Sequence, residues 1–301
     1  ADMELWTKDS KLSNFADDTQ SIIIKNNKED ALETVKVESK KIIDFFASNN
    51  FVNNANKAAL IYNSKGSGCE ISVDIGGEIL SSTYTEKLLG LHINADLNWN
   101  SHIDEISSVL KKRIGILKRI KQKIPADKLY IIADAIFNSV IRYGIAVYLL
   151  PTYEKEDLKA RKLSKEMESL QVIQNNMLRT IYGLRITDRV NMLELRKKIK
   201  MMSVNQMTIY HTIMEVFKII HNKSSEQIND KYRHLDRHST RKNTNNYLRV
   251  PELHEHRKCT GFTYCGAKIY NSLSIKIRET QDSSIFKELV KNWIWDEIPS
   301  Y

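Results

Sequence analysis

The sequence of 301 residues has few cysteines, no long apolar run and no internal repeat. Its three cysteines, Cys69, Cys259 and Cys265, do not suit a disulfide framework, so a reducing compartment is the default. No apolar run approaches the roughly 18 to 20 residues that span a bilayer, and the amino terminus shows no signal pattern. These absences argue against disulfide-stapled, helical membrane-spanning and repeat architectures for these residues.

Two common catalytic motifs are also missing, because the sequence contains neither a nucleophile elbow nor a Walker loop. The GSG triplet at 66–68 lacks the helix start and the lysine that a phosphate-binding loop needs. Positive charge is what the chain has in excess, with a formal net charge of +9. This excess favours a polyanionic partner, most simply a nucleic acid, with a membrane surface as the alternative.

Hydrophobic periodicity predicts an α+β fold, with a mixed amino-terminal part and a mainly helical remainder. The stretch KLSNFADDTQSIII predicts a β-hairpin over residues 11–24, because β-branched residues follow its polar turn. From Asn27 the period becomes helical, and an amphipathic helix is expected to about Ser48. After an Asn-rich turn and a short apolar strand at 51–63, two further strands are expected at Glu70–Ile75 and Thr83–Ile93, separated by a Gly76-Gly77 turn.

The remainder is predicted to be mostly helical. An apolar stripe from Ile103 to Ile120 predicts one helix, and Pro125 precedes a second helix that runs from Ala126 or Asp127 to about Leu150. Further helices are expected at 154–182, 189–199 and 202–221, with a closing helix around Phe286, Leu289, Val290 and Trp293. A basic loop or linker is expected at 224–246, and irregular strand-like pieces around Gly261 and Gly266.

Two adjacent carboxylates, Asp17 and Asp18, lie at the turn of the predicted hairpin. A tight hairpin is a rigid mount for carboxylates that bind hard cations. Mg²⁺ takes oxygen ligands and commonly uses one or two carboxylates together with substrate phosphates. The alternative is an ordinary surface turn, since acidic residues are common in turns.

The order of features after this turn resembles the reverse transcriptases of non-LTR retrotransposons. The matching segments are FADDTQSII, a helix that ends in DFFASNNF, the turn NNANK, the strand AALIYN and the stretch KLLGLHINADLNWNSHID. In that family an aromatic-Ala-Asp-Asp hairpin carries palm carboxylates, an Asn-x-x-Lys turn follows, and an aromatic-Leu-Gly strand forms the primer grip. Here Leu88 replaces the usual aromatic residue, and Ala58 replaces the usual Thr after Lys57.

The resemblance continues through most of the chain. The segment from Trp99 to Tyr148 resembles the thumb, SLQVIQNNMLRTIYG resembles the helix that follows it, and the segment from Leu248 to Glu279 resembles the carboxy-terminal block of the same reading frames. The resemblance implies four parts: a partial palm at 1–95, the thumb at 96–150, a helical downstream region at 151–223, and a basic linker with a mixed carboxy-terminal region at 224–301.

The resemblance also assigns roles to individual residues. Asp17 is expected to be a ligand of catalytic Mg²⁺ and Asp18 the adjacent palm carboxylate. Lys57 is the expected proton donor or charge stabiliser toward the departing pyrophosphate, and its alternative is a solvated turn lysine. Leu89 and Gly90 are the expected primer grip, and their alternatives are a buried strand residue and a bulge or close-approach glycine.

The expected thumb helix is strongly basic. The segment from Trp99 to Lys123 contains seven basic residues and two acidic residues, Asp104 and Glu105, which gives a net charge of +5. With the apolar stripe turned inward, much of this charge lies on the exposed side and can follow a phosphate backbone without reading bases. The alternative is an ordinary solvated helix face. The predicted nucleic-acid-binding residues are Lys111, Lys112, Arg113, Lys118, Arg119 and Lys121.

The resemblance implies part of an RNA-directed DNA polymerase whose partners are an RNA template, a DNA primer or RNA–DNA duplex, and deoxynucleotides, with no membrane involved. Only sixteen residues precede Asp17, so we expect a carboxy-terminal fragment without the further palm Asp and the fingers, inactive alone. The resemblance implies a nuclear or cytoplasmic ribonucleoprotein setting. The alternatives are a non-catalytic basic scaffold that binds nucleic acid and a protein-interaction module on the helices at 154–221.

Overall fold

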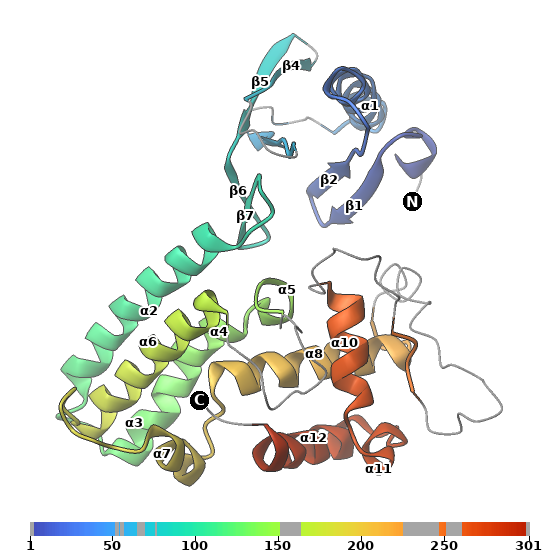
Figure 1. Cartoon of the computed structure of the whole chain (residues 1–301). Coiled ribbons are helices and arrows are strands. Elements are labelled where there is room, and N and C mark those ends of the chain that lie inside the picture. Colours follow the sequence, from blue (N-terminus) through green and yellow to red (C-terminus); the bar gives the residue numbers. More distant parts are fainter. Residues whose placement is uncertain are drawn as a thin grey trace. The chain divides into compact units, whose positions relative to one another are not determined.

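The computed structural model describes residues 3–51, 54, 57–64, 70–75, 77–150, 164–224, 247–250 and 261–298. The chain forms two compact units, Ala1–His102 and Ile103–Tyr301. Among the described residues the first unit contains small sheets and one long helix, and the second is built of helices (Figure 1). The predicted α+β class is therefore confirmed at this level. None of the helices in the described ranges is long and apolar enough to cross a membrane.

The predicted amino-terminal hairpin is present. Strand β1 (Lys11–Phe15) pairs antiparallel with β2 (Asp18–Ile22), and the pair Phe15–Asp18 closes a turn of two residues, Ala16 and Asp17. The strands are short and mostly exposed, so the hairpin depends on its neighbours for stability.

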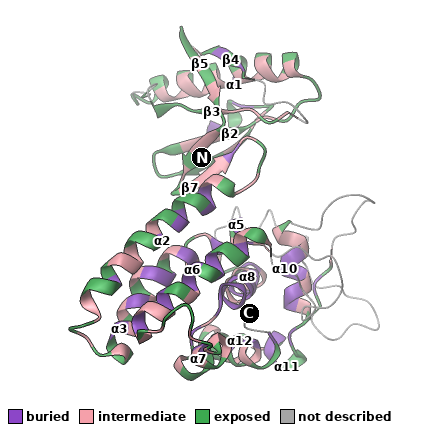
Figure 2. Cartoon of the chain, turned by 60° about the vertical axis from the view of Figure 1, so that its left-hand side comes forward, coloured by how far each residue is buried: buried purple, intermediate pink, exposed green. Residues whose placement is uncertain are grey.

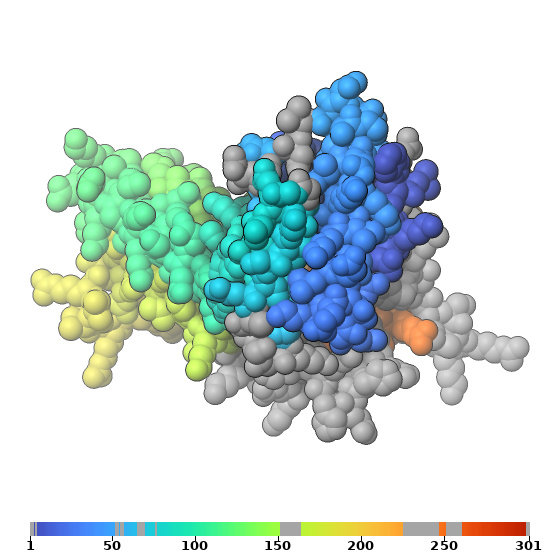
Figure 3. All heavy atoms as spheres, turned by 90° about the horizontal axis from the view of Figure 1, so that it is seen from above, coloured from blue at the N-terminus to red at the C-terminus, as the bar shows by residue number. Residues whose placement is uncertain are grey.

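Helix α1 (Lys28–Ser48) confirms the predicted helix almost to the residue. Asn27 caps it, because its side-chain oxygen accepts a hydrogen bond of 2.7 Å from the backbone N–H of Asp30. Glu29 and Asp30 in the first turn also suit the positive end of the helix dipole. The outer face of α1 lies on the molecular surface (Figure 3).

Three strands form the second small sheet of this unit. Strand β3 (Leu60–Ile61) runs parallel to β5 (Glu78–Thr83), and β4 (Ser72–Ile75) pairs antiparallel with the other edge of β5. Strand β4 matches the predicted strand at 70–75, and β5 follows the predicted glycine turn directly. Gly77 has a φ of +93°, a value that suits glycine in a hairpin turn.

The predicted single strand Thr83–Ile93 is wrong. The chain forms β6 (Thr85–Leu88) and β7 (Leu91–Asn94), an antiparallel hairpin that turns at Leu89 and Gly90. Both turn residues have positive φ, +46° and +83°, which is the pattern of a type I′ turn. The run KLLGLHI hid this turn, because its apolar residues continue through it and only Gly90 signals it.

Helix α2 (Asn100–Ile120) confirms the first predicted helix of the second part. The second predicted helix begins at Ala126 as expected but does not continue to Leu150. Helix α3 (Ala126–Ala133) passes into a π-helical turn, η3 (Asp134–Asn138), and then α4 (Ser139–Arg142). Gly144, with a φ of +67°, ends this path before the short helix α5 (Ile145–Tyr148). A left-handed residue cannot extend an α-helix, so the periodicity overestimated its length.

The second unit packs around α8. The described helices after residue 150 are α6 (Lys165–Tyr182), α7 (Met192–Ile199), α8 (Val204–Ile220), α10 (Phe262–Asn271), α11 (Ile275–Arg278) and α12 (Ser283–Glu297). Helix α8 is buried along most of its length (Figure 2). Phe217 of α8 stacks on Phe286 of α12 with ring centroids 4.0 Å apart, inside a large apolar cluster. The predicted closing helix is therefore α12, and its apolar residues face this core.

The predicted strand-like pieces around Gly261 and Gly266 are wrong, because residues 262–271 form α10. Gly261 is its N-cap, and Gly266 is a contact residue rather than a turn. A Cβ atom at Gly266 would lie 2.7 Å from Cγ2 of Val216, so glycine allows α10 to approach α8 closely. Residues 154–163 of the predicted helix 154–182 and 225–246 of the predicted linker lie outside the described residues.

Candidate active site and nucleic-acid interface

Asp17 and Asp18 lie at the tip of the β1–β2 hairpin. Both are exposed, and neither side-chain carboxylate forms an ion pair or a hydrogen bond with another described residue. Ala16 before them has a φ of +52°, and the turn therefore has the φ signs of type II′, where glycine normally occupies this position. For alanine this conformation costs about 1–2 kcal/mol. The hairpin thus holds two free carboxylates next to a strained residue, and such strain is common at functional sites.

The donor chemistry of this tip suits Mg²⁺ in part. Oxygen ligands such as carboxylates are the ligands that Mg²⁺ prefers, and no basic side chain in the described ranges pairs with these two carboxylates. Within the described ranges no group of three or more His, Cys, Asp or Glu residues gathers at one point. The described part of the chain therefore supplies two ligands for a metal at this tip, and a complete site needs others.

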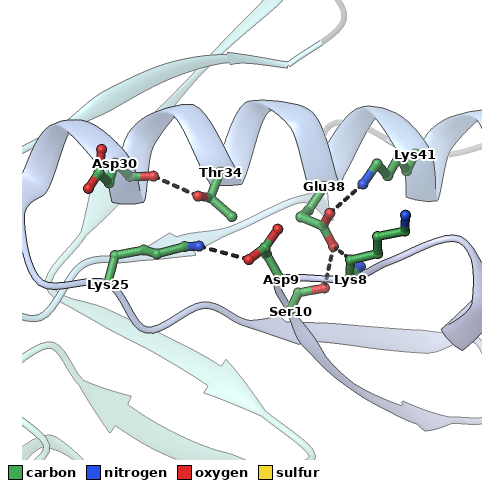
Figure 4. A network of polar contacts seen from close by, with 8 residues as sticks. All are labelled: Lys8, Asp9, Ser10, Lys25, Asp30, Thr34, Glu38 and Lys41. Atoms are coloured by element: carbon green, nitrogen blue, oxygen red, sulfur yellow. Dashed lines mark hydrogen bonds and ion pairs between the residues drawn. The ribbon is translucent and has the colours of Figure 1, made fainter.

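A buried carboxylate anchors the hairpin to α1 (Figure 4). The side chain of Glu38 is only 1% exposed and accepts hydrogen bonds from the backbone N–H of Lys8 at 3.1 Å and the hydroxyl of Ser10 at 2.9 Å. Its other oxygen accepts from Nζ of Lys41 at 2.7 Å. Residues 8–10 lead directly into β1, so Glu38 fixes the start of the strand whose far end reaches the carboxylate tip.

The environment of Glu38 favours its charged form. Burial raises the pKa of the carboxyl, but the hydrogen bonds from Lys41 and Ser10 outweigh burial and hold the pKa below its ordinary value of 4.5. Sequence reasoning missed this residue. The signal was present, because Glu38 lies between Val35 and Ile42 on the apolar stripe of α1, where a charged side chain requires partners.

A second ion pair joins the two ends of the hairpin. Asp9 precedes β1 and Lys25 follows β2, and Oδ1 of Asp9 lies 2.9 Å from Nζ of Lys25 (Figure 4). The hydrogen bond and the charge of Lys25 lower the pKa of Asp9. The pair is solvent-exposed, so it contributes to hairpin alignment more than to stability.

Lys57 lies in a tight turn, as the Asn-x-x-Lys pattern predicts. Its backbone N–H donates a hydrogen bond to the carbonyl oxygen of Asn54 at 2.9 Å, and Lys57 is exposed to solvent. The carboxylates of Asp17 and Asp18 form no hydrogen bond or ion pair with another described residue. They therefore have no such contact with Lys57, Leu89 or Gly90. These residues belong to separate elements of the first unit.

Leu89 is not the buried strand residue of the alternative interpretation. It occupies the first central position of the β6–β7 turn and is 39% exposed. We expect Leu89→Asn to stabilise the first unit by about 1 kcal/mol, because Asn tolerates left-handed backbone better than Leu. Urea unfolding compared with the wild type measures the effect, and Leu97→Asn, at another left-handed leucine outside this hairpin, is expected to stabilise by a similar amount for the same reason. Lower stability for Leu89→Asn would show that the Leu89 side chain stabilises the turn.

Helix α2 carries several exposed basic residues, and Figure 2 shows exposed positions along this helix. Lys111, Lys112, Lys118 and Arg119 are exposed, and Lys121 just beyond the helix is half-buried. Arg113 differs from the other predicted contacts, because its guanidinium donates a hydrogen bond to the carbonyl oxygen of Ile136 in the π-helical turn. That bond ties α2 to η3, so Arg113 has a structural partner in the described chain.

Comparison with known proteins leaves the family open. No protein-family model matches this sequence, and neither the curated proteins nor the solved structures contain a significant match.

Proposed function

We propose that this chain is part of an RNA-directed DNA polymerase of the non-LTR reverse transcriptase type. In this proposal residues 1–95 belong to the palm and 96–150 to the thumb. The observation that carries it is the tip of the β1–β2 hairpin, where Asp17 and Asp18 are adjacent, exposed and free of ion pairs. The order of elements after the hairpin supports the same assignment, since α1, the Asn54–Lys57 turn and the Leu89-Gly90 turn follow in the sequence of the family motifs.

The residues of the chain have distinct tasks in this proposal. Asp17 and Asp18 would be ligands of Mg²⁺, which would supply activation of a primer hydroxyl and stabilisation of the leaving oxygen. Lys57 donates a proton or a positive charge toward the departing pyrophosphate. The exposed face of α2 holds the phosphate backbone of the duplex. A further carboxylate must come from outside the described residues.

Primer extension tests the proposal. A polymerase that contains this chain is expected to extend a DNA primer on an RNA template with Mg²⁺ and deoxynucleotides, and to stop when EDTA removes the metal. The 301-residue chain alone is expected to give no extension, because two carboxylates do not define a two-metal site. Extension by the chain alone would contradict the need for further ligands, and no extension by the larger polymerase would contradict the proposed function.

A second candidate is a non-catalytic scaffold that binds nucleic acid. The exposed basic face of α2 favours it, because this face needs no metal and no third carboxylate. Primer extension distinguishes the two candidates. A scaffold would bind the RNA–DNA duplex as tightly as a polymerase part does, but no assembly that contains it would extend a primer.

A further inference from the structure

Helix α2 has a glycine at the centre of its exposed basic face. Gly115 lies within the unbroken helix Asn100–Ile120. On an α-helix the nearest surface neighbours of a residue are those three and four positions away. For Gly115 these four positions hold Lys111, Lys112, Lys118 and Arg119, all of them exposed. Every nearest neighbour of the glycine on the helix surface is therefore basic, and we call the four basic residues around Gly115 the glycine-centred quartet.

Neither backbone conformation nor packing explains this glycine. Its φ is not positive, and a Cβ atom built on Gly115 would meet no atom within 4 Å. A glycine in the middle of a helix destabilises it relative to alanine. The chain therefore keeps an unfavourable residue at a position where a Cβ atom would meet no neighbour in the described fold.

The side chains of the four basic residues also lack partners among the described residues. No described residue forms a hydrogen bond or an ion pair with any of these four side chains. Lys118 and Arg119 lie in the last turn, where positive charge offsets the helix dipole. Lys111 and Lys112 lie two turns earlier, beyond the reach of that effect. The helix dipole thus explains the positions of Lys118 and Arg119. It explains neither the two lysines at 111 and 112 nor the glycine at 115.

We propose that the glycine-centred quartet is a seat for phosphate groups of a nucleic-acid backbone. Without a side chain at Gly115, a phosphate reaches the helix surface, and ammonium and guanidinium groups from both sides donate to its oxygens. Residues 111 and 118 lie about 10 Å apart along the helix axis, a span that their long side chains bridge from both ends. Recognition through phosphate is independent of base sequence. This inference rests on the proposed nucleic-acid function and specifies where the backbone is held.

Substitution of the glycine tests the seat. We expect Gly115→Leu in the full chain to weaken binding of a labelled 20-base-pair RNA–DNA heteroduplex roughly 5- to 20-fold, because the side chain keeps phosphate away from the four charges. The matched control is Ser108→Leu, which lies two turns earlier on the same face and outside the quartet. It is expected to bind within about twofold of the wild type. Thermal unfolding excludes a folding defect, since Gly115→Leu is expected to raise the midpoint by roughly 2–4 °C.

A second variant separates failure of the seat from failure of the duplex-binding face. Replacing the four basic residues of the quartet with Gln is expected to reduce the slope of log affinity against log salt concentration by roughly 2–4. If this variant loses affinity for the heteroduplex while Gly115→Leu binds like Ser108→Leu, the phosphate seat at Gly115 is overturned. Duplex binding by the basic residues of α2 is then still supported. If both leave heteroduplex binding and its salt slope unchanged, the seat and the proposed role of α2 are overturned together. Quartet-dependent binding to phosphatidylserine vesicles without heteroduplex binding would also overturn the seat.

Discussion

Asp17→Asn is expected to reduce primer extension by roughly 100- to 10,000-fold in a polymerase that contains this chain, because a metal ligand supports several kcal/mol of transition-state stabilisation. Asn has nearly the same shape as Asp but no charge, so the hairpin should keep its turn. Asp17 has no ion pair to lose within the described chain. The change is therefore expected to act on the proposed metal binding rather than on folding.

Duplex affinity distinguishes this loss from a general defect. Asp17→Asn should bind the RNA–DNA heteroduplex as tightly as the wild type, or slightly more tightly, since it removes a negative charge near phosphates. The matched control is Asp44→Asn, which changes an exposed carboxylate on α1 of the same unit and should leave extension unchanged. Extension by Asp17→Asn within about tenfold of the wild type would contradict the metal role.

Glu38→Ala is expected to destabilise the first unit by about 2–4 kcal/mol, because it leaves the N–H of Lys8 and the hydroxyl of Ser10 without their buried acceptor. Amide hydrogen exchange in α1 and β1 under increasing urea measures this loss in the full chain. Glu33→Ala, at an exposed position of the same helix, is the control and should change stability little. Equal exchange in the two variants would show that the Glu38 network does not hold the hairpin.

The same carboxylate gives a pH dependence of known sign. Because the folded-state pKa of Glu38 lies below its ordinary value of 4.5, its charged form stabilises the folded state. This contribution is complete above pH 4.5 and disappears as the pH falls through the folded-state pKa. We expect the stability difference between the wild type and Glu38→Gln to be constant near pH 7 and to shrink on acidification below 4.5. A difference that grows on acidification would contradict the charged, hydrogen-bonded state of Glu38.

Local signals in the sequence predicted several elements correctly. Helices α1, α2 and α12 follow from apolar residues at helical spacing, and the start of α1 follows from the change of period at Asn27, which the structure shows to be its N-cap. The β1–β2 hairpin follows from a polar turn between a polar strand and a β-branched one. Each of these depends on residues within a few positions of one another, which is why the sequence alone determined them.

The tertiary structure decided the features that depend on distant residues. Gly266 allows α10 to pack against Val216, and Glu38 is paired because residues 8–10 lie against α1. The guanidinium of Arg113 donates a hydrogen bond to the carbonyl oxygen of Ile136, which lies in a π-helical turn that periodicity does not reveal. The sequence by itself placed Asp17 and Asp18 on a hairpin and put basic residues on one face of α2. Only packing decided which of those charges keep a partner within the chain and which remain free for an external one, because burial and pairing depend on neighbours that lie far apart in the sequence.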